Sequence, residues 1–133
     1  MTSKVTYLGD LRTECTHVQS GNTFITDAPV DNNGKGEAFS PTDVVATGLA
    51  TCMITVMGIK ARDLGVDMKG TTASVTKIMA ADPRRISGIQ VILNFPFSAD
   101  QKTRTILERT ANTCPVHYSL HPNIKKEITF NWQ

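Results

Sequence analysis

An uncharged, apolar run over residues 44–59 is the feature that most constrains the fold of this chain. It opens with a strong helix-start signal, in which Ser40 can cap the helix, Pro41 suits the first helical position and Asp43 favours the positive end of the helix dipole. Apolar side chains then fall on every face of the helix, which is typical of a helix surrounded by protein. The run is too short and too rich in threonine and glycine to span about 30 Å of hydrocarbon. We therefore expect a buried core helix and no membrane span.

The length of the chain limits how such a helix can be covered. With 133 residues, the chain fits one globular domain, residues 1–133, with a core that is adequate but not large. Such a domain has few other elements with which to surround a helix. We therefore predict a homodimer, in which a second copy supplies part of the cover. The alternative is that the helix lies between the chain's own sheet and its second helix.

Short strands are predicted on both sides of this helix. Before the helix, turn signals separate three strands of a meander, followed by a polar, glycine-bearing loop that we expect to be exposed: strands 4–7, 11–18 and 23–26, and loop 31–36. After it, two strand-like segments are joined by a turn, and the chain closes on an alternating strand: 66–81, 86–95 and 128–132.

A second helix is predicted between the last two strands. Ser98 and Gln101 form a capping-box pattern at its start, and Leu107, Ala111 and Cys114 fall on one side by steps of four and three. Because a residue that precedes proline is pushed out of the helical region, we expect Cys114 to be the last residue of this helix or the first beyond it, facing inward.

Composition excludes several classes of function. The net charge of +2 is spread along the chain, so no basic patch predicts nucleic-acid binding. The first ten residues carry no apolar signal segment, which places the chain in the cytoplasm. Three cysteines cannot form a closed disulfide framework, so any pairing is expected to be catalytic or redox-linked. No glycine-rich nucleotide loop or serine nucleophile elbow is present, and thiol chemistry without a cofactor is what remains.

Two of the cysteines, Cys52 in the long helix and Cys114 before a proline, are the candidate reactive groups. A free thiol titrates near pH 8.5, so only a few per cent is ionised at neutral pH, and burial reduces that share. A cation in contact with a thiolate contributes on the order of 4 kcal/mol at an effective dielectric of about 20. Lys60 and Arg62 lie roughly 12 to 15 Å along the helix from Cys52. The cation must come from another element or a partner chain, and Arg12 in the second strand is a candidate.

The segments SPTD at 40–43, LATC at 49–52 and CPV at 114–116 together resemble the pattern of the OsmC/Ohr family, over nearly the whole chain. This family comprises osmotically inducible protein C and the organic hydroperoxide resistance proteins. The resemblance implies an OsmC-like α+β fold with antiparallel sheets around long central helices. It also implies an intertwined homodimer with the active site at the subunit interface.

The resemblance further implies a cysteine-based hydroperoxide reductase that protects against oxidative stress. In the peroxidase members the first cysteine attacks the peroxide, becomes a sulfenic acid and is resolved by the second as an intrachain disulfide. Carried over, Cys52 is the peroxidatic residue and Cys114 the resolving one, acting on small organic hydroperoxides and, as a second class, inorganic ones. An external dithiol of the lipoyl type then reduces the disulfide. Arg12 matches the arginine that the family places near the reactive thiol.

The chain departs from the Ohr pattern at one position. Ohr members carry a glutamate directly after the proline, where this chain has Thr42, with Asp43 one step later. One residue rotates a side chain by about 100° around a helix, so we expect Asp43 to cap the helix and not to bind Arg12. Glu37 in the preceding loop is the predicted substitute. The chain is thus more similar to the OsmC-like branch than to the Ohr enzymes.

Two other interpretations remain open from the sequence. The first is a non-enzymatic dimer that binds a small hydrophobic ligand at the subunit interface, with both cysteines as core filler. The second is a metal site with Cys-x-x-His spacing, whose ligands are Cys114, His117 and His121, with Cys52 or His17 as the fourth. Cys15 alternates with its strand neighbours and is expected to be a packing residue.

Overall fold

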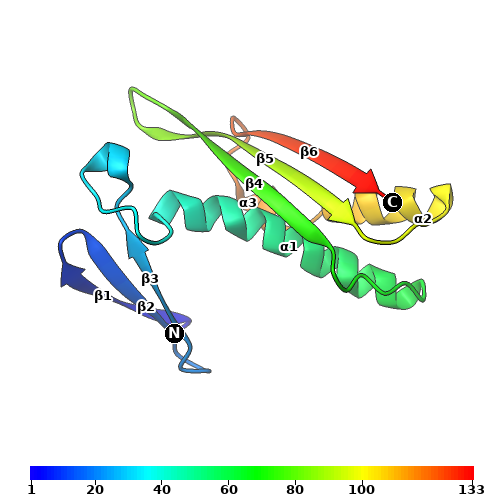
Figure 1. The fold of residues 1–133 in the computed structure, drawn as a ribbon, viewed down its shortest axis with the longest axis horizontal. Helices are drawn as coiled ribbons and strands as arrows, with labels where there is room; N and C mark the ends of the chain where they lie inside the picture. Colours follow the sequence, from blue (N-terminus) through cyan, green and yellow to red (C-terminus); the bar gives the residue numbers. More distant parts are fainter. The chain divides into compact units, whose positions relative to one another are not determined.

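The computed structural model describes residues 1–133, which divide into two compact units, Met1–Val45 and Ala46–Gln133 (Figure 1). In chain order the elements are β1 (Ser3–Gly9), β2 (Arg12–His17), β3 (Thr23–Asp27), the short 3-10 helix η1 (Val30–Asn32), α1 (Pro41–Asp63), β4 (Thr72–Ala80), β5 (Arg85–Phe95), α2 (Gln101–Ala111), α3 (Pro115–Ser119) and β6 (Lys125–Trp132). The expected α+β class is confirmed. The expectation of a single domain over 1–133 stays a prediction.

The N-terminal unit contains the predicted meander, with its strands in the order β1-β2-β3 and both pairings antiparallel. The turn between β2 and β3 is closed by the backbone N–H of His17, which donates to the carbonyl of Asn22 at 2.8 Å. Gly21 has a φ of +77° there, a conformation that suits glycine. This turn fixes the register, so that Thr16 lies opposite Thr23 and Arg12 lies opposite Asp27.

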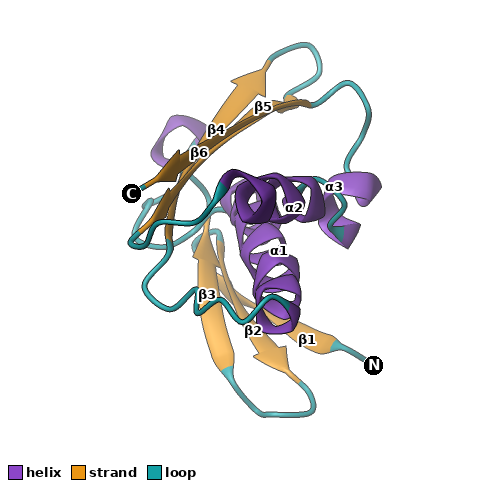
Figure 2. Cartoon of the chain, turned by 90° about the vertical axis from the view of Figure 1, so that its right-hand side faces the viewer, coloured by secondary structure: helices purple, strands orange, loops and turns teal.

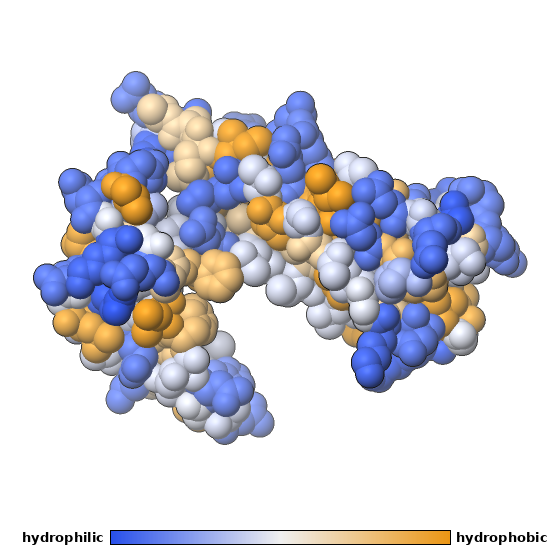
Figure 3. Space-filling view, viewed as in Figure 1, coloured by the Kyte–Doolittle hydropathy of each residue, from blue (hydrophilic) through white to orange (hydrophobic).

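Burial in this unit is unusual, because the residues that it buries fully are all polar or charged: Thr26, Asp27 and Ser40. Many large apolar side chains of this unit are exposed instead: Val5, Tyr7, Leu8, Leu11, Val18, Phe24, Val30, Phe39 and Val45. Figure 3 shows orange, hydrophobic atoms at the molecular surface among the hydrophilic ones. The N-terminal unit therefore lacks a hydrophobic core of its own.

The start of α1 is a reciprocal capping box, as the sequence predicted. The hydroxyl of Ser40 accepts the backbone N–H of Asp43 at 3.1 Å, and the Asp43 carboxylate accepts the backbone N–H of Ser40 at 2.9 Å. Two amide groups that no helical carbonyl can reach are thereby satisfied. Pro41 takes the first helical position.

The C-terminal unit contains a second three-stranded sheet in the order β4-β5-β6. β4 and β5 pair antiparallel, whereas β5 and β6 pair parallel. The expectation of antiparallel sheets is wrong for this second pairing, because the chain between β5 and β6 runs through α2 and α3 and can return to the starting end of the sheet. Figure 2 shows α1 and α2 on the same side of this sheet.

The strand expected over 66–81 is shorter in the structure, since β4 begins only at Thr72. The preceding residues form a turn in which the N–H of Thr71 donates to the carbonyl of Met68 at 3.0 Å. Gly70 lies within this turn and has a φ of +90°. Hydrogen bonds within this turn thus take the place of strand pairing before Thr72.

The hydrophobic core of the chain lies in the C-terminal unit. Its fully buried members come from α1, β5, α2 and the residue before α3: Ala46, Leu49, Ala50, Met53, Met57, Ala61, Ile89, Val91, Leu93, Phe95, Leu107, Ala111 and Cys114. The sheet presents one face to this core, because alternate residues of β5 are buried.

α1 buries only one stripe within a single chain, through residues spaced three and four apart. Ile59 on another face is 60% exposed. The expectation of a helix covered on all faces is therefore not met by one chain alone. By length and mean hydropathy, 1.7 over its most apolar window, α1 could cross a membrane, but core helices of soluble proteins pass the same test.

α2 begins and ends differently from the prediction. Asp100, not Ser98, is its N-cap, and the Asp100 side chain accepts the N–H of Thr103 at 2.7 Å. Serine and aspartate both cap helices well, so residue type alone does not decide between Ser98 and Asp100. Cys114 lies beyond the end of α2 and is the N-cap of α3, because Pro115 occupies the first position of that new helix.

An aromatic cluster ties the end of the second sheet to α2. The ring of Trp132 stacks on that of Phe95 with 3.8 Å between centroids. The indole Nε1–H of Trp132 donates to Glu108 at 2.9 Å. The guanidinium of Arg104 lies 5.7 Å from the indole centroid, within cation–π range. β6 is thereby fixed to α2 as well as to β5.

Candidate active site

The structure brings Cys52 and Cys114 together, although they come from different elements. Cys52 lies in the middle of α1, is partly exposed and packs against the core. Cys114 is completely buried. Both are free thiols, and Cys52 lies near enough to Cys114 to influence the pKa of the Cys114 thiol. Two cysteines distant in sequence are therefore neighbours in the fold.

The environment of Cys114 favours its protonated form. As the N-cap of α3, its Sγ accepts the backbone N–H of His117 at 3.3 Å. Burial raises the pKa of the Cys114 thiol, the contact with Cys52 raises it further, and the backbone N–H groups of His117 and Val116 oppose this rise in pKa. At neutral pH Cys114 is thus protonated.

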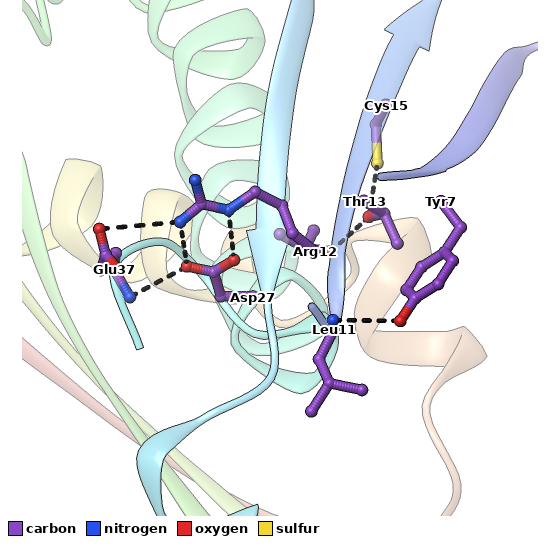
Figure 4. Close-up of polar contacts among 8 residues, drawn as sticks. Tyr7, Leu11, Arg12, Thr13, Cys15, Asp27 and Glu37 are labelled. Carbon is purple, nitrogen blue, oxygen red and sulfur yellow. Dashed lines mark hydrogen bonds and ion pairs between the residues drawn. The ribbon is translucent and has the colours of Figure 1, made fainter. Parts of the chain in front are cut away.

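A second cluster, in the N-terminal unit, is built on Arg12 (Figure 4). Its Nε donates to Asp27 Oδ1 at 2.7 Å and its Nη2 donates to Asp27 Oδ2 at 2.9 Å. Nη2 also lies 3.8 Å from Glu37 Oε2. Arg12 and Asp27 form a bidentate pair, the strongest geometry for an arginine and a carboxylate, whereas the contact with Glu37 is longer and single.

Local backbone structure explains why these side chains meet. Arg12 and Asp27 are register partners on β2 and β3. Glu37 is brought in by its own backbone N–H, which donates to Asp27 Oδ2 at 3.1 Å. The hydrogen bond from Arg12 lowers the pKa of Asp27, although burial opposes this, and the Glu37 N–H lowers it further. Asp27 is therefore ionised at neutral pH.

Asp27 was overlooked in the sequence, where Glu37 was the predicted partner of Arg12. Glu37 does lie beside Arg12, but as the more distant of two carboxylates. A signal for Asp27 was available, because counting outward from the turn between β2 and β3 places it opposite Arg12. Asp43 forms the capping box, as expected.

The structure also places the remaining candidate residues. Cys15 lies on β2 between Val5 and Phe24 of the neighbouring strands and is partly buried, consistent with packing. Burial, followed by the charge of Lys126, lowers the pKa of His117. No group of three or more His, Cys, Asp or Glu side chains is arranged to hold a metal ion, so the geometry gives the metal interpretation no support.

A surface hollow of about 590 Å³ lies in the N-terminal unit. Apolar side chains and two carboxylates line it: Phe24, Ile25, Gly36, Glu37, Ala38, Phe39 and Asp43. A small amphipathic molecule fits such a lining by chemistry. The interpretation as a dimeric module that binds a hydrophobic ligand at the subunit interface stays a prediction.

Comparison with known proteins places this geometry in a family. The sequence model of the OsmC-like proteins matches residues 34–129. A solved protein from Psychrobacter arcticus, named for an osmotic-stress and detoxification response, is 59% identical, with 98% of this chain and 95% of that chain covered and a TM-score of 0.95. None of the curated proteins matches the chain.

More distant structures share the fold. An organic hydroperoxide resistance protein from Legionella pneumophila is 15% identical over 98% of this chain and 97% of that chain, with a TM-score of 0.76. One from Elizabethkingia anophelis is 14% identical over 100% and 97%, with a TM-score of 0.77. The chain therefore belongs to the OsmC-like family, and its fold is that of proteins named for hydroperoxide resistance.

Proposed function

We propose that this OsmC-like protein is a thiol-dependent peroxidase that reduces organic hydroperoxides through Cys52 and Cys114. The observation that carries the proposal is that the two cysteines are neighbours, one partly exposed and one buried. A partly exposed thiol can meet a substrate, and a buried neighbour can reach only its partner. The family resemblance supports the same assignment of roles.

In the oxidative step the thiolate of Cys52 attacks the terminal oxygen of the hydroperoxide. The O–O bond breaks, the alkoxide takes up a proton and leaves as an alcohol, and Cys52 becomes a sulfenic acid. By the family resemblance we assign to Arg12 the positive charge that stabilises the negative charge developing on the leaving oxygen, since a guanidinium stays charged at any relevant pH.

In the resolving step the sulfur of Cys114 attacks the sulfur of Cys52. The S–O bond breaks, and the hydroxyl leaves as water with the proton of the Cys114 thiol, so that one disulfide forms and no further reactant is consumed. The raised pKa of Cys114 supports this order of events, because it keeps the proton available until the sulfenic acid has formed.

An external dithiol of the lipoyl type closes the cycle by thiol–disulfide exchange. We infer that it attacks Cys52, because Cys114 is 0% exposed and an incoming thiolate cannot approach its sulfur. Cys114 is then the leaving group, and the N–H of His117, which already contacts its Sγ, stabilises it. The dithiol ends as its own disulfide.

We further propose that the working form is a cytoplasmic homodimer. The exposed apolar side chains of the N-terminal unit and the uncovered face of α1 need cover, and a second copy is the expected source. Sedimentation of the protein over a wide range of concentrations tests this. A monomer at the highest concentration would contradict it.

Thiol titration after one equivalent of cumene hydroperoxide, and separately after hydrogen peroxide, tests the enzyme. We expect wild type and Cys15→Ser each to lose two thiols per chain by an intrachain disulfide. Cys52→Ser is expected to lose none, and Cys114→Ser to stop at a sulfenic acid that dimedone captures. Equal thiol loss in Cys52→Ser and wild type would refute the mechanism. No loss in wild type would favour the ligand-binding interpretation.

A further inference from the structure

The two carboxylates beside Arg12 hold it in different ways. Asp27 is buried, its side chain 2% exposed, and it binds both Nε and Nη2 of the guanidinium. Glu37 has a side chain that is 63% exposed and approaches only Nη2, at 3.8 Å. Two parallel bonds fix a planar group in position and angle, whereas one long contact to a solvated carboxylate fixes neither.

Asp27 is itself held rigidly by the backbone on both sides. Its N–H donates to the carbonyl of Phe39 at 3.0 Å, and the N–H of Ala28 donates to the carbonyl of Leu11 at 3.1 Å. Its carboxylate accepts the N–H of Glu37 in addition to the two bonds from Arg12. Asp27 therefore has the fixed surroundings that orientation of another side chain requires.

The arrangement leaves one edge of the guanidinium outside these contacts. The two bonds to Asp27 use Nε and Nη2, and the contact to Glu37 also uses Nη2. In Figure 4 the third guanidinium nitrogen, Nη1, points away from both carboxylates. Asp27 thus holds Arg12 by one edge without using the donors of Nη1.

We propose that Asp27 is the positioning residue that orients Arg12 for the peroxidase reaction. It takes the place of the glutamate that Ohr members carry after the helix-start proline, where this chain has Thr42. The carboxylate of Glu37 contributes little to this orientation. The proposal rests on the proposed function, because it assigns Arg12 to the chemistry of Cys52. Asp27 undergoes no covalent change and touches no reacting atom.

The kinetic test compares Asp27→Asn with Glu37→Gln as its matched control. Asp27→Asn is nearly isosteric and removes the charge and one acceptor of the fork. We expect the rate of Cys52 oxidation by cumene hydroperoxide to fall roughly tenfold to 100-fold, the scale expected when a catalytic group is misplaced by about 1 Å. Glu37→Gln is expected to stay within about twofold of wild type, as for an exposed ion pair. Equal losses in the two variants would overturn the proposal.

A double-mutant cycle separates positioning from a general loss of structure. If Asp27 acts through Arg12, Asp27→Asn has no further effect on the oxidation rate in an Arg12→Ala background. A merely structural role would reduce the rate equally in both backgrounds, and that result would overturn the proposal. Should Asp27→Asn fail to fold, Asp27→Glu decides. The longer side chain of Asp27→Glu displaces the carboxylate, so this variant is expected to slow Cys52 oxidation more than Glu37→Gln does. A wild-type oxidation rate in Asp27→Glu would refute the positioning role.

Nuclear magnetic resonance tests the same contact without peroxide. The Nε–H resonance of Arg12 is expected to be slowly exchanging in wild type and in Glu37→Gln, and rapidly exchanging in Asp27→Asn. Loss of slow exchange in Glu37→Gln alone would refute the role of Asp27. Failure of the proposed function gives a different pattern, in which wild type and Cys52→Ser are equally inert toward hydroperoxides while the Arg12 resonance still depends on Asp27. That pattern would overturn the assignment of Arg12 to catalysis.

Discussion

The two units of the chain bury different kinds of side chain. The N-terminal unit fully buries only polar or charged residues, Thr26, Asp27 and Ser40, while the C-terminal unit buries all the hydrophobic core residues. The first is ordered by directional bonds such as the Arg12–Asp27 fork, and the second by close packing around α1 and β5. Each unit also holds one part of the predicted chemistry, a cation in the first and two thiols in the second.

This difference shows how one small chain can carry two conflicting requirements. A guanidinium in a hydrophobic core would lose its hydration, which costs far more than a thiol loses there. A resolving thiol on a polar surface would be open to every thiol and oxidant in solution. Separate units allow Arg12 to stay partly hydrated while Cys114 stays dry.

The largest expected effect on stability is in the C-terminal unit, which contains the hydrophobic core. Leu107→Ala removes a completely buried side chain and is expected to lower the free energy of unfolding by about 2 to 5 kcal/mol. Val30→Ala, at a side chain that is 75% exposed in the other unit, is expected to stay within about 0.5 kcal/mol. Urea unfolding measures both. Similar losses for the two variants would contradict the assignment of the core to one unit.

The next largest effect concerns turnover. Cys114→Ser is expected to lower steady-state reduction of cumene hydroperoxide with dihydrolipoamide by at least about 100-fold, because a preplaced thiol acts at a very high effective concentration. The first oxidation of Cys52 is expected to persist, since Cys114 takes no part in that step. Cys15→Ser is the control and is expected to retain wild-type turnover. A slow first oxidation in Cys114→Ser would show that Cys114 also activates Cys52.

A smaller effect is expected at the start of α1. Ser40→Ala removes the hydroxyl that accepts the N–H of Asp43 and is expected to cost about 1 kcal/mol of stability, as other helix caps do. Thr51→Ala, at an exposed position of the same helix, is expected to change stability by less than about 0.5 kcal/mol. Thermal unfolding of the two variants checks the pair. An unchanged Ser40→Ala would mean that the capping box does not stabilise α1.

Asp27 in the N-terminal unit is expected to make the free energy of unfolding depend on pH in the acid range. The hydrogen bond from Arg12 lowers the pKa of Asp27, so the unfolded chain takes up a proton at a higher pH than the folded chain. Stability from Asp27 is present above its unfolded pKa of about 3.9 and is lost as the pH falls through the folded pKa. The gap between wild type and Asp27→Asn in urea unfolding is therefore expected at pH 7 and shrinks at pH 3. A constant gap would contradict this.

Cys114 in the C-terminal unit is expected to make the free energy of unfolding depend on pH in the alkaline range, with a smaller effect. Burial raises the pKa of Cys114, so above about pH 8.5 the unfolded chain loses its proton before the folded chain does. Stability is present below that pH and falls as the pH rises toward the folded pKa. Cys114→Ala is expected to flatten this alkaline decline, which unfolding between pH 7 and 10 measures. An equal decline in both proteins would assign it to other groups.

The elements that could be predicted from the sequence are those set by local patterns. The capping box at Ser40, the meander turns and the inward face of α2 with Leu107 all follow from residues close together in the chain. The direction of β6 did not, because an alternating strand looks the same whether it pairs parallel or antiparallel. Asp100 was missed because Ser98 is an equally good cap by type.

The parts of the site that belong to short motifs could be predicted from the sequence. The part that depends on the register between strands could not. The resemblance led us to expect that Cys52 and Cys114 would be neighbours. The Arg12–Asp27 pair depends on the register of a hairpin across fifteen residues of chain, which no short motif records. Glu37 was chosen because it lies near the helix start in sequence, whereas the distance that matters is across the sheet.

Trp132 has a practical consequence for all of these measurements. It is the chain's single tryptophan, and its indole stacks on Phe95 and bonds to Glu108, all within the C-terminal unit. Fluorescence excited selectively at the indole, so that Tyr7 does not contribute, therefore monitors that unit and does not detect fraying of the meander. A fluorescence melt will report a single sharp loss of signal even where residues 1–45 have opened earlier, and amide hydrogen exchange is the probe that detects such opening.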